Sequence, residues 1–449
     1  MRAALKYDGT DDVAMAESTP PMAVRASAAP AAPARATLIL AIICVSYFMV
    51  ILDNSIVFTG LPQIRSAMGF SETGLSWITN AYVLVFGGLL LLGARAGDLF
   101  GHRRVFLLTR SFAEGRVRNR AMAAYSAVAG LGAALGLVVG GLVADLISWR
   151  AGFFLNVPVG IAMVALAVRF LPETERQGGR FYVAGALLAT AGSTALVFGI
   201  VDATDIGWTA PATLIPLVAG LVMLVLFVAV ERRAAQPIVP LRLFASRERS
   251  GAYVTRMLCM GAMIGFFFTA QFVQSVYHWT PLQAGLAFLP MTLVNFVFAV
   301  QVPRLLERAS RPRVLTIGLI VTMVGMVWLS RLDLHTPYLT GVALPMVLIG
   351  AGQGLVPAPL TSSGVDEVAP ADAGAASGLV NTVHQIGSAL SLGILTAVAA
   401  SVSTGHEAAG IAARWGAALT GSAVLLALAL AATLTLVVPT RTRPHERSL

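Results

Sequence analysis

Apolar runs of about 20 residues, separated by short polar segments, recur along the whole chain. A helix rises about 1.5 Å per residue, so a run of this length crosses the hydrocarbon core of a bilayer. The pattern predicts an all-α polytopic membrane protein with short connections and no second soluble domain. The predicted spans are 36–58, 76–96, 119–143, 150–171, 182–203, 211–231, 251–276, 282–303, 313–331, 340–361, 375–401 and 413–438.

The composition agrees with this pattern. Of 449 residues, 57% are hydrophobic and 12% are charged, whereas soluble domains carry about 25% charged residues. Cys44 and Cys259 both lie inside apolar runs, where we expect small core residues rather than a disulfide. Residues 1–35 are rich in Ala and Pro and lack periodicity, which predicts a disordered tail before an uncleaved first helix.

The net charge of +9 is distributed as in a membrane protein rather than as in a nucleic-acid-binding protein. Lys6 is the only lysine, and the arginines cluster in alternate connections. With a cytoplasmic N-terminus, about 26 of the 31 basic residues lie inside, which predicts cytoplasmic termini in a cell (plasma or inner) membrane. The exceptions are Arg65, Arg150, Arg331 and Arg414 outside, and Arg256 within a span.

Two basic segments that each resemble a cytoplasmic loop stand almost back to back in residues 93–130. Between Arg104 and Arg110 lie only the five residues VFLLT, too few to cross a bilayer. Any crossings missing at this point must be even in number, because both flanks are predicted to lie on the same side.

Six motifs, in their order along the chain, resemble the fourteen-helix drug:proton antiporters of the major facilitator superfamily, which are typically bacterial multidrug or antibiotic exporters. The resemblance extends from about residue 36 to 438. The motifs are LDNSIVFTGLPQI (52–64), GARAGDLFGHRR (93–104), GLGAALGLVVGG (130–141), SWRAGFFLNVPVG (148–160), VQSVYHWTPLQAGLAFLP (273–290) and GAASGLVNTVHQIGSALS (374–391).

The resemblance implies a major facilitator fold of about 12 helices that lacks the hairpin of helices three and four. Residues 36–171 would form an incomplete N-terminal bundle, 182–231 two linker helices, 251–438 a C-terminal six-helix bundle, and 439–449 a cytoplasmic tail. The alternative is a complete twelve-helix transporter in two halves of six, divided at residues 231–250. Motif order favours the missing hairpin, because the motif expected in helix five falls in the third predicted span.

Polar residues inside the spans are the candidates for proton coupling and the substrate cavity. A carboxylate at the bilayer centre costs about 2.5–3.5 kcal/mol, so Asp53, followed by Asn54, is expected to bind a proton or a cationic group; the alternative is a helix-end carboxylate in interfacial water or a structural pair. Gln271 and Gln274 lie on a Met- and Phe-rich span that either lines the cavity or faces lipid. Arg256 is a candidate for snorkelling to the interface.

A polar stripe is predicted on the eleventh span, where Asn381, His384, Gln385 and Ser388 follow the spacing i, i+3, i+4 and i+7. Such a stripe should face protein or a wet cavity. His384 stands where the family commonly has Arg, so a titratable group replaces a fixed charge. Hydrogen bonding between helices is the structural alternative.

A loop motif and a glycine motif complete the candidate sites. The resemblance implies that Gly97, Asp98, Gly101, Arg103 and Arg104 form a cytoplasmic gate, although Ala94 and His102 depart from the family pattern and the arginines also fit plain positive-inside topology. It also implies an antiporter motif on the helix face of Gly132, Gly136, Gly140 and Gly141, with Leu137 in place of the usual Pro. Plain close packing of two helices is the alternative.

The chain has no metal-ligand spacing, nucleophile elbow or GxxxxGK[ST] motif, so we expect neither an enzyme nor a cofactor. The resemblance implies a secondary transporter that uses the proton gradient to export drugs, antibiotics or other amphipathic compounds, with a hydrophobic or cationic small molecule as the substrate. Its expected partners are this substrate, protons and the lipid bilayer, without nucleic acid. The alternatives are a non-transporting or degenerate membrane protein, because of the missing hairpin, and proton-coupled solute uptake.

Overall fold

The computed structural model describes residues 138–170, 183–234, 237–369, 372–402 and 408–438, together with short pieces at 45, 49, 60–61, 63–70, 74, 77–81 and 135–136. Helices account for nearly all of the described residues. The main elements are α5 (Trp149–Phe170), α6 (Val183–Ile206), α7 (Pro211–Arg233), η1 (Leu241–Ala245), α8 (Arg247–Ala262), α9 (Gly265–Ser275), α10 (Pro281–Ala287), α11 (Leu289–Arg308), α12 (Arg311–Leu329), η2 (Leu339–Ala343), α13 (Leu344–Leu355), α14 (Pro357–Val365), α15 (Ala373–Val402), α16 (Ala408–Ala432) and η4 (Thr433–Val437).

Eight segments in the described part of the chain are long and apolar enough to span a membrane. They coincide one to one with the eight predicted spans from 182–203 to 413–438, so these predictions are confirmed. The fourth predicted span, 150–171, corresponds to helix α5. The spans 36–58, 76–96 and 119–143 lie mostly outside the described residues.

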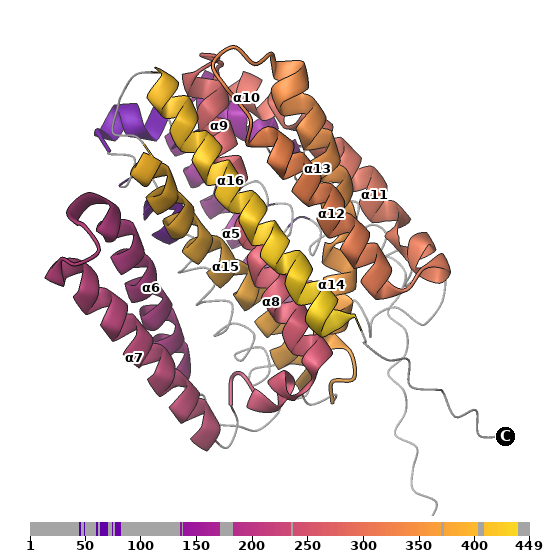
Figure 1. Cartoon of the computed structure of the whole chain (residues 1–449). Helices are drawn as coiled ribbons and strands as arrows, with labels where there is room; N and C mark the ends of the chain where they lie inside the picture. The colour runs from indigo at the N-terminus through magenta and orange to yellow at the C-terminus, as the bar shows by residue number, and fades with distance from the viewer. Residues whose placement is uncertain are drawn as a thin grey trace, which may run out of the picture.

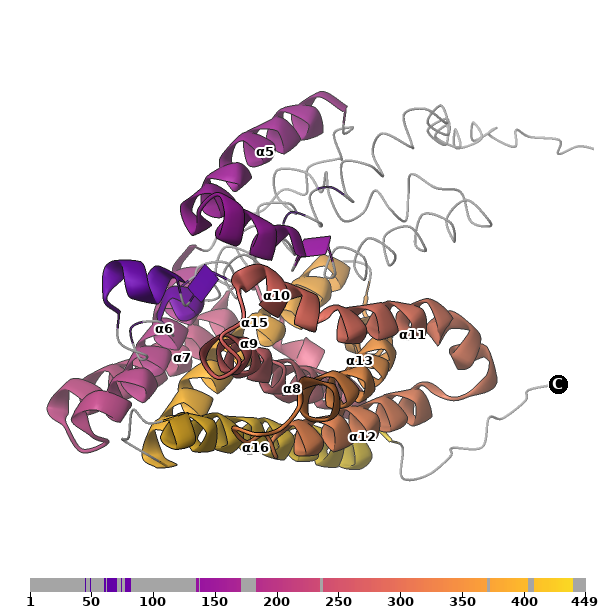
Figure 2. The same ribbon diagram turned by 90° about the horizontal axis from the view of Figure 1, so that it is seen from above.

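The helices after α7 form one bundle, and α6 and α7 lie beside it as a separate pair (Figure 1). Helix α8 runs through the middle of this bundle, with α15 and α16 packed against it. The view from above places α5 on the opposite side from α12 and α16 (Figure 2). The α6–α7 pair contacts the bundle through the face that α6 presents to α15. Below, the end of the bundle with loops 276–280 and 330–338 is called the outer end, and the end with residues 234–246 the inner end.

Several spans are interrupted near their middle. In the seventh span, α8 ends at Ala262 and α9 begins at Gly265. In the tenth span, α13 ends at Leu355 and α14 begins at Pro357, because a proline has no N–H to continue the hydrogen-bond ladder. The break in the seventh span separates an inner polar segment from an outer aromatic one, and both segments contribute to the candidate site.

Glycines let α8 and α15 approach each other closely. A Cβ atom on Gly387 would lie 2.3 Å from the carbonyl oxygen of Met257, and one on Gly261 would lie 2.9 Å from the carbonyl oxygen of Gly387. Only a residue without a side chain fits at either position. The same device joins α6 to α7, where a Cβ on Gly220 would lie 2.8 Å from the carbonyl oxygen of Gly192.

Charged residues hold the inner end together. Arg242 on η1 forms a bidentate ion pair with Asp372, at 2.5 and 2.6 Å, directly before α15. Arg311 pairs with Asp366, and the Arg249 guanidinium donates to the carbonyl oxygens of Leu243 and Asp366 at 3.4 and 3.2 Å. These contacts tie η1 to the start of α15, and the first turns of α8 and α12 to the segment after α14.

Candidate functional site

The inner part of the bundle contains a cationic and a titratable side chain close together. Arg256 on α8 is only 9% exposed, and its Nη1 donates to Thr361 Oγ1 on α14 at 3.1 Å. His384 lies on the segment of α15 that packs against α8. Gly387 makes this arrangement possible, because it lies one turn after His384 and contacts the residue after Arg256. Arg256 therefore joins helices inside the bundle instead of snorkelling to the interface.

The predicted stripe on α15 has an uneven environment. His384 and Gln385 are half-buried, Ser388 is buried and Asn381 is exposed. Asn381 donates to the carbonyl oxygen of Ser377 at 3.2 Å, and Ser388 donates to that of His384 at 3.0 Å. Both of these hydrogen bonds stay within α15, so in the described part of the chain neither side chain forms the bond between helices that is the structural alternative.

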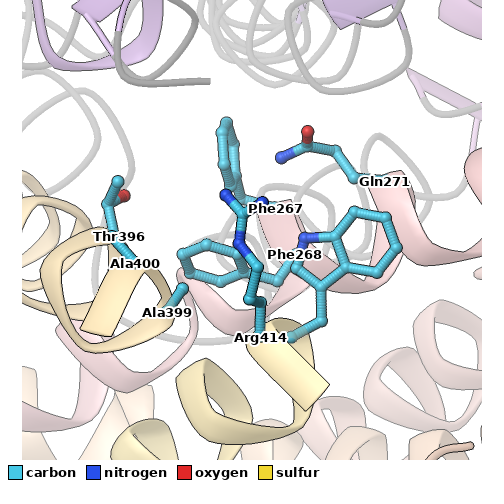
Figure 3. Close-up of a pocket in the computed structure, with 8 residues that line it drawn as sticks. Phe267, Phe268, Gln271, Thr396, Ala399, Ala400 and Arg414 are labelled. Carbon is cyan, nitrogen blue, oxygen red and sulfur yellow. The ribbon is translucent and has the colours of Figure 1, made fainter. Parts of the chain in front are cut away.

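A pocket lies at the outer end, where α9, α15 and α16 meet (Figure 3). Its floor and walls are aromatic and small residues, and its polar groups are the amide of Gln271, the hydroxyl of Thr396 and the guanidinium of Arg414. The lining residues are Phe267, Phe268, Gln271, Thr396, Ala399, Ala400, Arg414 and Trp415.

The two glutamines of the seventh span occupy different positions. Gln271 is 7% exposed and lines the outer pocket. Phe267 and Phe268 are each 3% exposed, so the alternative of a lipid-facing helix is wrong for this part of α9. Gln274 is half-buried, and its Nε2 donates to the carbonyl oxygen of Ala270 on the same helix at 3.4 Å.

The glycine motif before α5 contacts the start of α10. Gly136, Gly140 and Gly141 are buried. A Cβ on Gly141 would lie 2.6 Å from the carbonyl oxygen of Pro281 and 3.0 Å from the Cα of Leu282. This backbone-to-backbone approach joins the first part of the chain to the C-terminal bundle at the outer end.

The remaining candidate residues lie outside the described residues, so their roles stay predictions. They are Asp53 and Asn54 of the first span, Gly97, Asp98, Gly101, Arg103 and Arg104 of the loop motif, and Gly132 of the glycine motif. Among the residues that are described, no cluster of three or more His, Cys, Asp or Glu side chains is placed to hold a metal ion.

Sequence reasoning missed the outer pocket. The charge distribution along the sequence counts Arg414 among the residues outside, whereas the hydropathy pattern places it at the second position of the last predicted span. A charge inside a span was therefore the signal available. Thr396 gave no signal, because a single hydroxyl in an apolar helix commonly bonds to its own backbone. Which aromatic residues of α9 meet α15 and α16 depends on the tertiary packing.

Comparison with known proteins identifies relatives over nearly the whole chain. The model of the Major Facilitator Superfamily matches residues 107–392. The cephamycin export protein CmcT of Amycolatopsis lactamdurans is 37% identical over 457 residues, covering 91% of this chain and 93% of that protein. The puromycin resistance protein pur8 of Streptomyces alboniger is 34% identical over 422 residues, covering 83% of each. The human organic anion transporter MFSD10 (TETRAN) has a similar fold, with a TM-score of 0.54 at 16% identity, covering 89% of this chain and 99% of that one.

Proposed function

The chain belongs to the major facilitator superfamily, and on that premise we propose that it exports an antibiotic or another drug-like small molecule from the cell. The observation that carries the proposal is the match with CmcT, a protein named for cephamycin export, across 91% of this chain and 93% of that protein. The resistance protein pur8 supports the same class of activity.

Proton coupling is the energy source that we propose. Helical membrane spans seldom hold ionisable groups without a partner or a function. His384 is titratable and lies on the segment of α15 that packs against the part of α8 with Arg256. Together with Asp53, it is a candidate to take up a proton from one side and release it to the other. Gln385 and Gln274 are proposed to contribute polar surface to the substrate cavity.

The glycine contact at the outer end supports an alternating-access mechanism. Gly141 and Pro281 touch through their backbones, so the helix of the glycine motif closes against α10 when the outer side is shut. Opening that side requires this contact to separate. The loop with Gly97, Asp98, Gly101, Arg103 and Arg104 is proposed to make the opposite closure at the cytoplasmic side.

The placement in the membrane is also a proposal. We infer a multi-pass protein of the cell membrane with both termini in the cytoplasm, because this orientation retains most arginines inside. Single cysteines introduced by Arg116→Cys and Arg176→Cys should react with an impermeant maleimide from the same side. Labelling from opposite sides would overturn the orientation and the missing even number of crossings.

Three observations support the absence of a helical hairpin. The match with CmcT extends over 457 residues, whereas 91% of this 449-residue chain is about 409 residues, so about 48 positions have no counterpart here. The match with pur8 extends over 422 residues, whereas 83% of this chain is about 373 residues, so about 49 positions have no counterpart here. Two spans of about 20 residues with their turns need a similar length. The family match begins at residue 107, inside the segment where the two loop motifs meet.

The missing length favours one alternative function, a membrane protein that folds without transporting. Inserting the corresponding segment of CmcT between Arg104 and Arg110 separates the two hypotheses. If the chain transports as it stands, the insertion is unnecessary for extrusion. If extrusion appears only after the insertion, the chain itself does not transport and the export proposal fails for it.

Drug extrusion from an exporter-deficient bacterial host tests the proposed function. Cells that express the chain should accumulate less puromycin or cephamycin than control cells, and a protonophore should abolish the difference. Asp53→Asn should remove it too, while Asp145→Asn, at an exposed position, serves as the matched control. The export proposal fails if no compound is extruded in an energy-dependent manner. Proton-coupled uptake replaces it if inside-out vesicles with an acidic interior release the substrate.

A further inference from the structure

The inner half of α6 is packed into the C-terminal bundle through small residues. Ala186 and Ala189 are buried, and both belong to one hydrophobic cluster with the connection after α7, with α8 and with α15. The other members of this cluster are Ile238, Val239, Leu243, Tyr253, Ala376, Leu379 and Val380. Small residues at a helix interface let two backbones approach closely, which favours association inside a bilayer.

The outer half of α6 continues the same contact along α15. Val197 and Val201 of α6 and Ala389 of α15 form a second buried cluster, called the outer cluster below. A Cβ atom on Gly393, one turn further along α15, would lie 3.3 Å from Cγ2 of Val201. The contact therefore extends from Ala376 to Gly393, a rise of about 25 Å along α15. In Figure 1, α6 lies between α7 and α15.

Two polar contacts fasten the connection between α7 and α8. The backbone N–H of Val239 donates to Oε2 of Glu231 in the last turn of α7 at 2.8 Å, and Glu231 is buried. Arg242 holds Asp372, directly before α15, through its bidentate ion pair. The connection is thereby bound to α7 at one end and to the start of α15 at the other. A hinge at this place would have to break both contacts.

The first part of the chain meets α6 through a much smaller contact. Among the described helices, α5 makes no comparable contact with α6 or α7. Trp77, in the second predicted span, lies against Phe198 of α6 with 5.5 Å between the ring centroids, and it also packs on the outer cluster. Phe198 is 43% exposed. Elements joined by a large apolar interface move together, whereas a small contact leaves them free to separate.

We propose that α6 and α7 move with the C-terminal bundle during transport, and that Trp77 and Phe198 form an outer closure that opens between the two moving units. This inference rests on the proposed export function and specifies its alternating access. The boundary between the moving units then lies between α5 and α6 along the chain, and not between α7 and α8. The surface on which Trp77 closes is supplied jointly by α6 and α15, so the helix pair completes the outer closure.

A reversible disulfide between α6 and α15 tests whether these helices move together. Ile200→Cys with Gly393→Cys suits a disulfide, because the two Cβ atoms would lie 3.7 Å apart, within the range of about 3.5–4.5 Å that disulfides require. The full-length chain also carries Cys44→Ala, which leaves the buried Cys259 as the only other thiol. Oxidation with copper phenanthroline should leave puromycin extrusion unchanged, because α6 and α15 keep the same contact throughout transport.

The matched pair joins the two moving units. Trp77→Cys with Phe198→Cys, in the same background, is bridged by 1,2-ethanediyl bismethanethiosulfonate. Extrusion should be lost, because the outer side can no longer open, and dithiothreitol should restore it, which shows that the variant is folded. The single variants receive the same reagent and report the effect of modification without linkage. Free thiols, counted after denaturation with a polyethylene glycol maleimide, give the yield of each link.

The outcomes separate this inference from the export proposal. Loss of extrusion when Ile200→Cys and Gly393→Cys are joined, or full extrusion when Trp77→Cys and Phe198→Cys are joined, overturns it even though the reduced chains extrude drugs. Failure of either pair to link also overturns it. A chain that extrudes nothing in either state refutes export. The yield of the first link then still decides whether α6 is docked on α15, since complete oxidation supports the docking and an absence of oxidation overturns it.

Discussion

Replacing Gly387 by alanine tests the close approach of α8 and α15. The new Cβ would lie 2.3 Å from the carbonyl oxygen of Met257, and ordinary contact begins at 3.4 Å. The two helices would have to separate by about 1.1 Å at this point, because backbone atoms lie on both sides of the contact and no side chain can rotate away.

The expected cost follows from two opposing effects. Overpacking of a tight interior destabilises by about 1–3 kcal/mol, while alanine favours a helix over glycine by about 0.5–1 kcal/mol. The difference of the two ranges is about 0–2.5 kcal/mol, and the contact at 2.3 Å with a backbone atom favours the upper half of that range. The same displacement moves His384 away from Arg256, so proton-coupled extrusion should fall more than the amount of folded protein does.

The assay is unfolding in mixed detergent micelles, followed by tryptophan fluorescence, together with extrusion in cells. Gly160→Ala is the matched control, since nothing lies within 4 Å of its new Cβ, and it should be neutral or slightly stabilising. The reasoning is refuted if Gly387→Ala unfolds at the same denaturant concentration as Gly160→Ala and extrudes drug equally well.

Three further changes address other contacts. Gly141→Val should leave the protein folded but abolish extrusion in the cell assay, because the added side chain meets the backbone of Pro281 and Leu282; full activity would contradict the proposed outer closure. Tyr338→Phe removes the hydrogen bond to the carbonyl oxygen of Ala287 and should lower the free energy of unfolding by about 0.5–1.5 kcal/mol, whereas no change in the detergent titration would show that the bond contributes nothing. In the loop 330–338, the hydroxyl of Thr336 and the backbone N–H of His335 hold the pKa of Asp333 below its ordinary value. The stabilising contribution is therefore present above about pH 3.9 and is lost as the pH falls through the lower folded pKa. Thr336→Val should move the pKa of the Asp333 carboxyl back toward its ordinary value. The titration is followed by ¹³C NMR of labelled aspartate, and Asp333→Asn assigns the signal. An unchanged pKa would exclude the hydroxyl as the cause.

Much of the fold was predictable because a bilayer imposes a simple rule on the chain. Every backbone polar group in the hydrocarbon must be paired within its own helix, so hydropathy alone located α6, α7 and the six later spans. Breaks inside spans were harder. Pro357 marks one of them, but the interruption at Met263–Ile264 contains no proline and depends on how α8 and α9 pack.

The candidate site was only partly predictable. His384 and Gln271 could be identified because a polar residue inside an apolar span is unusual and normally has a partner or a function. That Arg256 contacts Thr361, with His384 on the segment of α15 that packs against α8, could not, since the three residues lie on different helices. Arg414 and Thr396 became recognisable as parts of one pocket only when α9, α15 and α16 were placed together.

The pair α6 and α7 has a consequence for how such chains change over time. Only 11% of the most apolar window of α7 is buried, and the pair meets the bundle along one face of α6. A hairpin held in this way enters and leaves the membrane on the same side. Its gain or loss therefore leaves every later loop facing the compartment it faced before. Membrane transporters can in this manner vary in helix number by twos while the order of their remaining motifs, and the sidedness of each, is inherited unchanged.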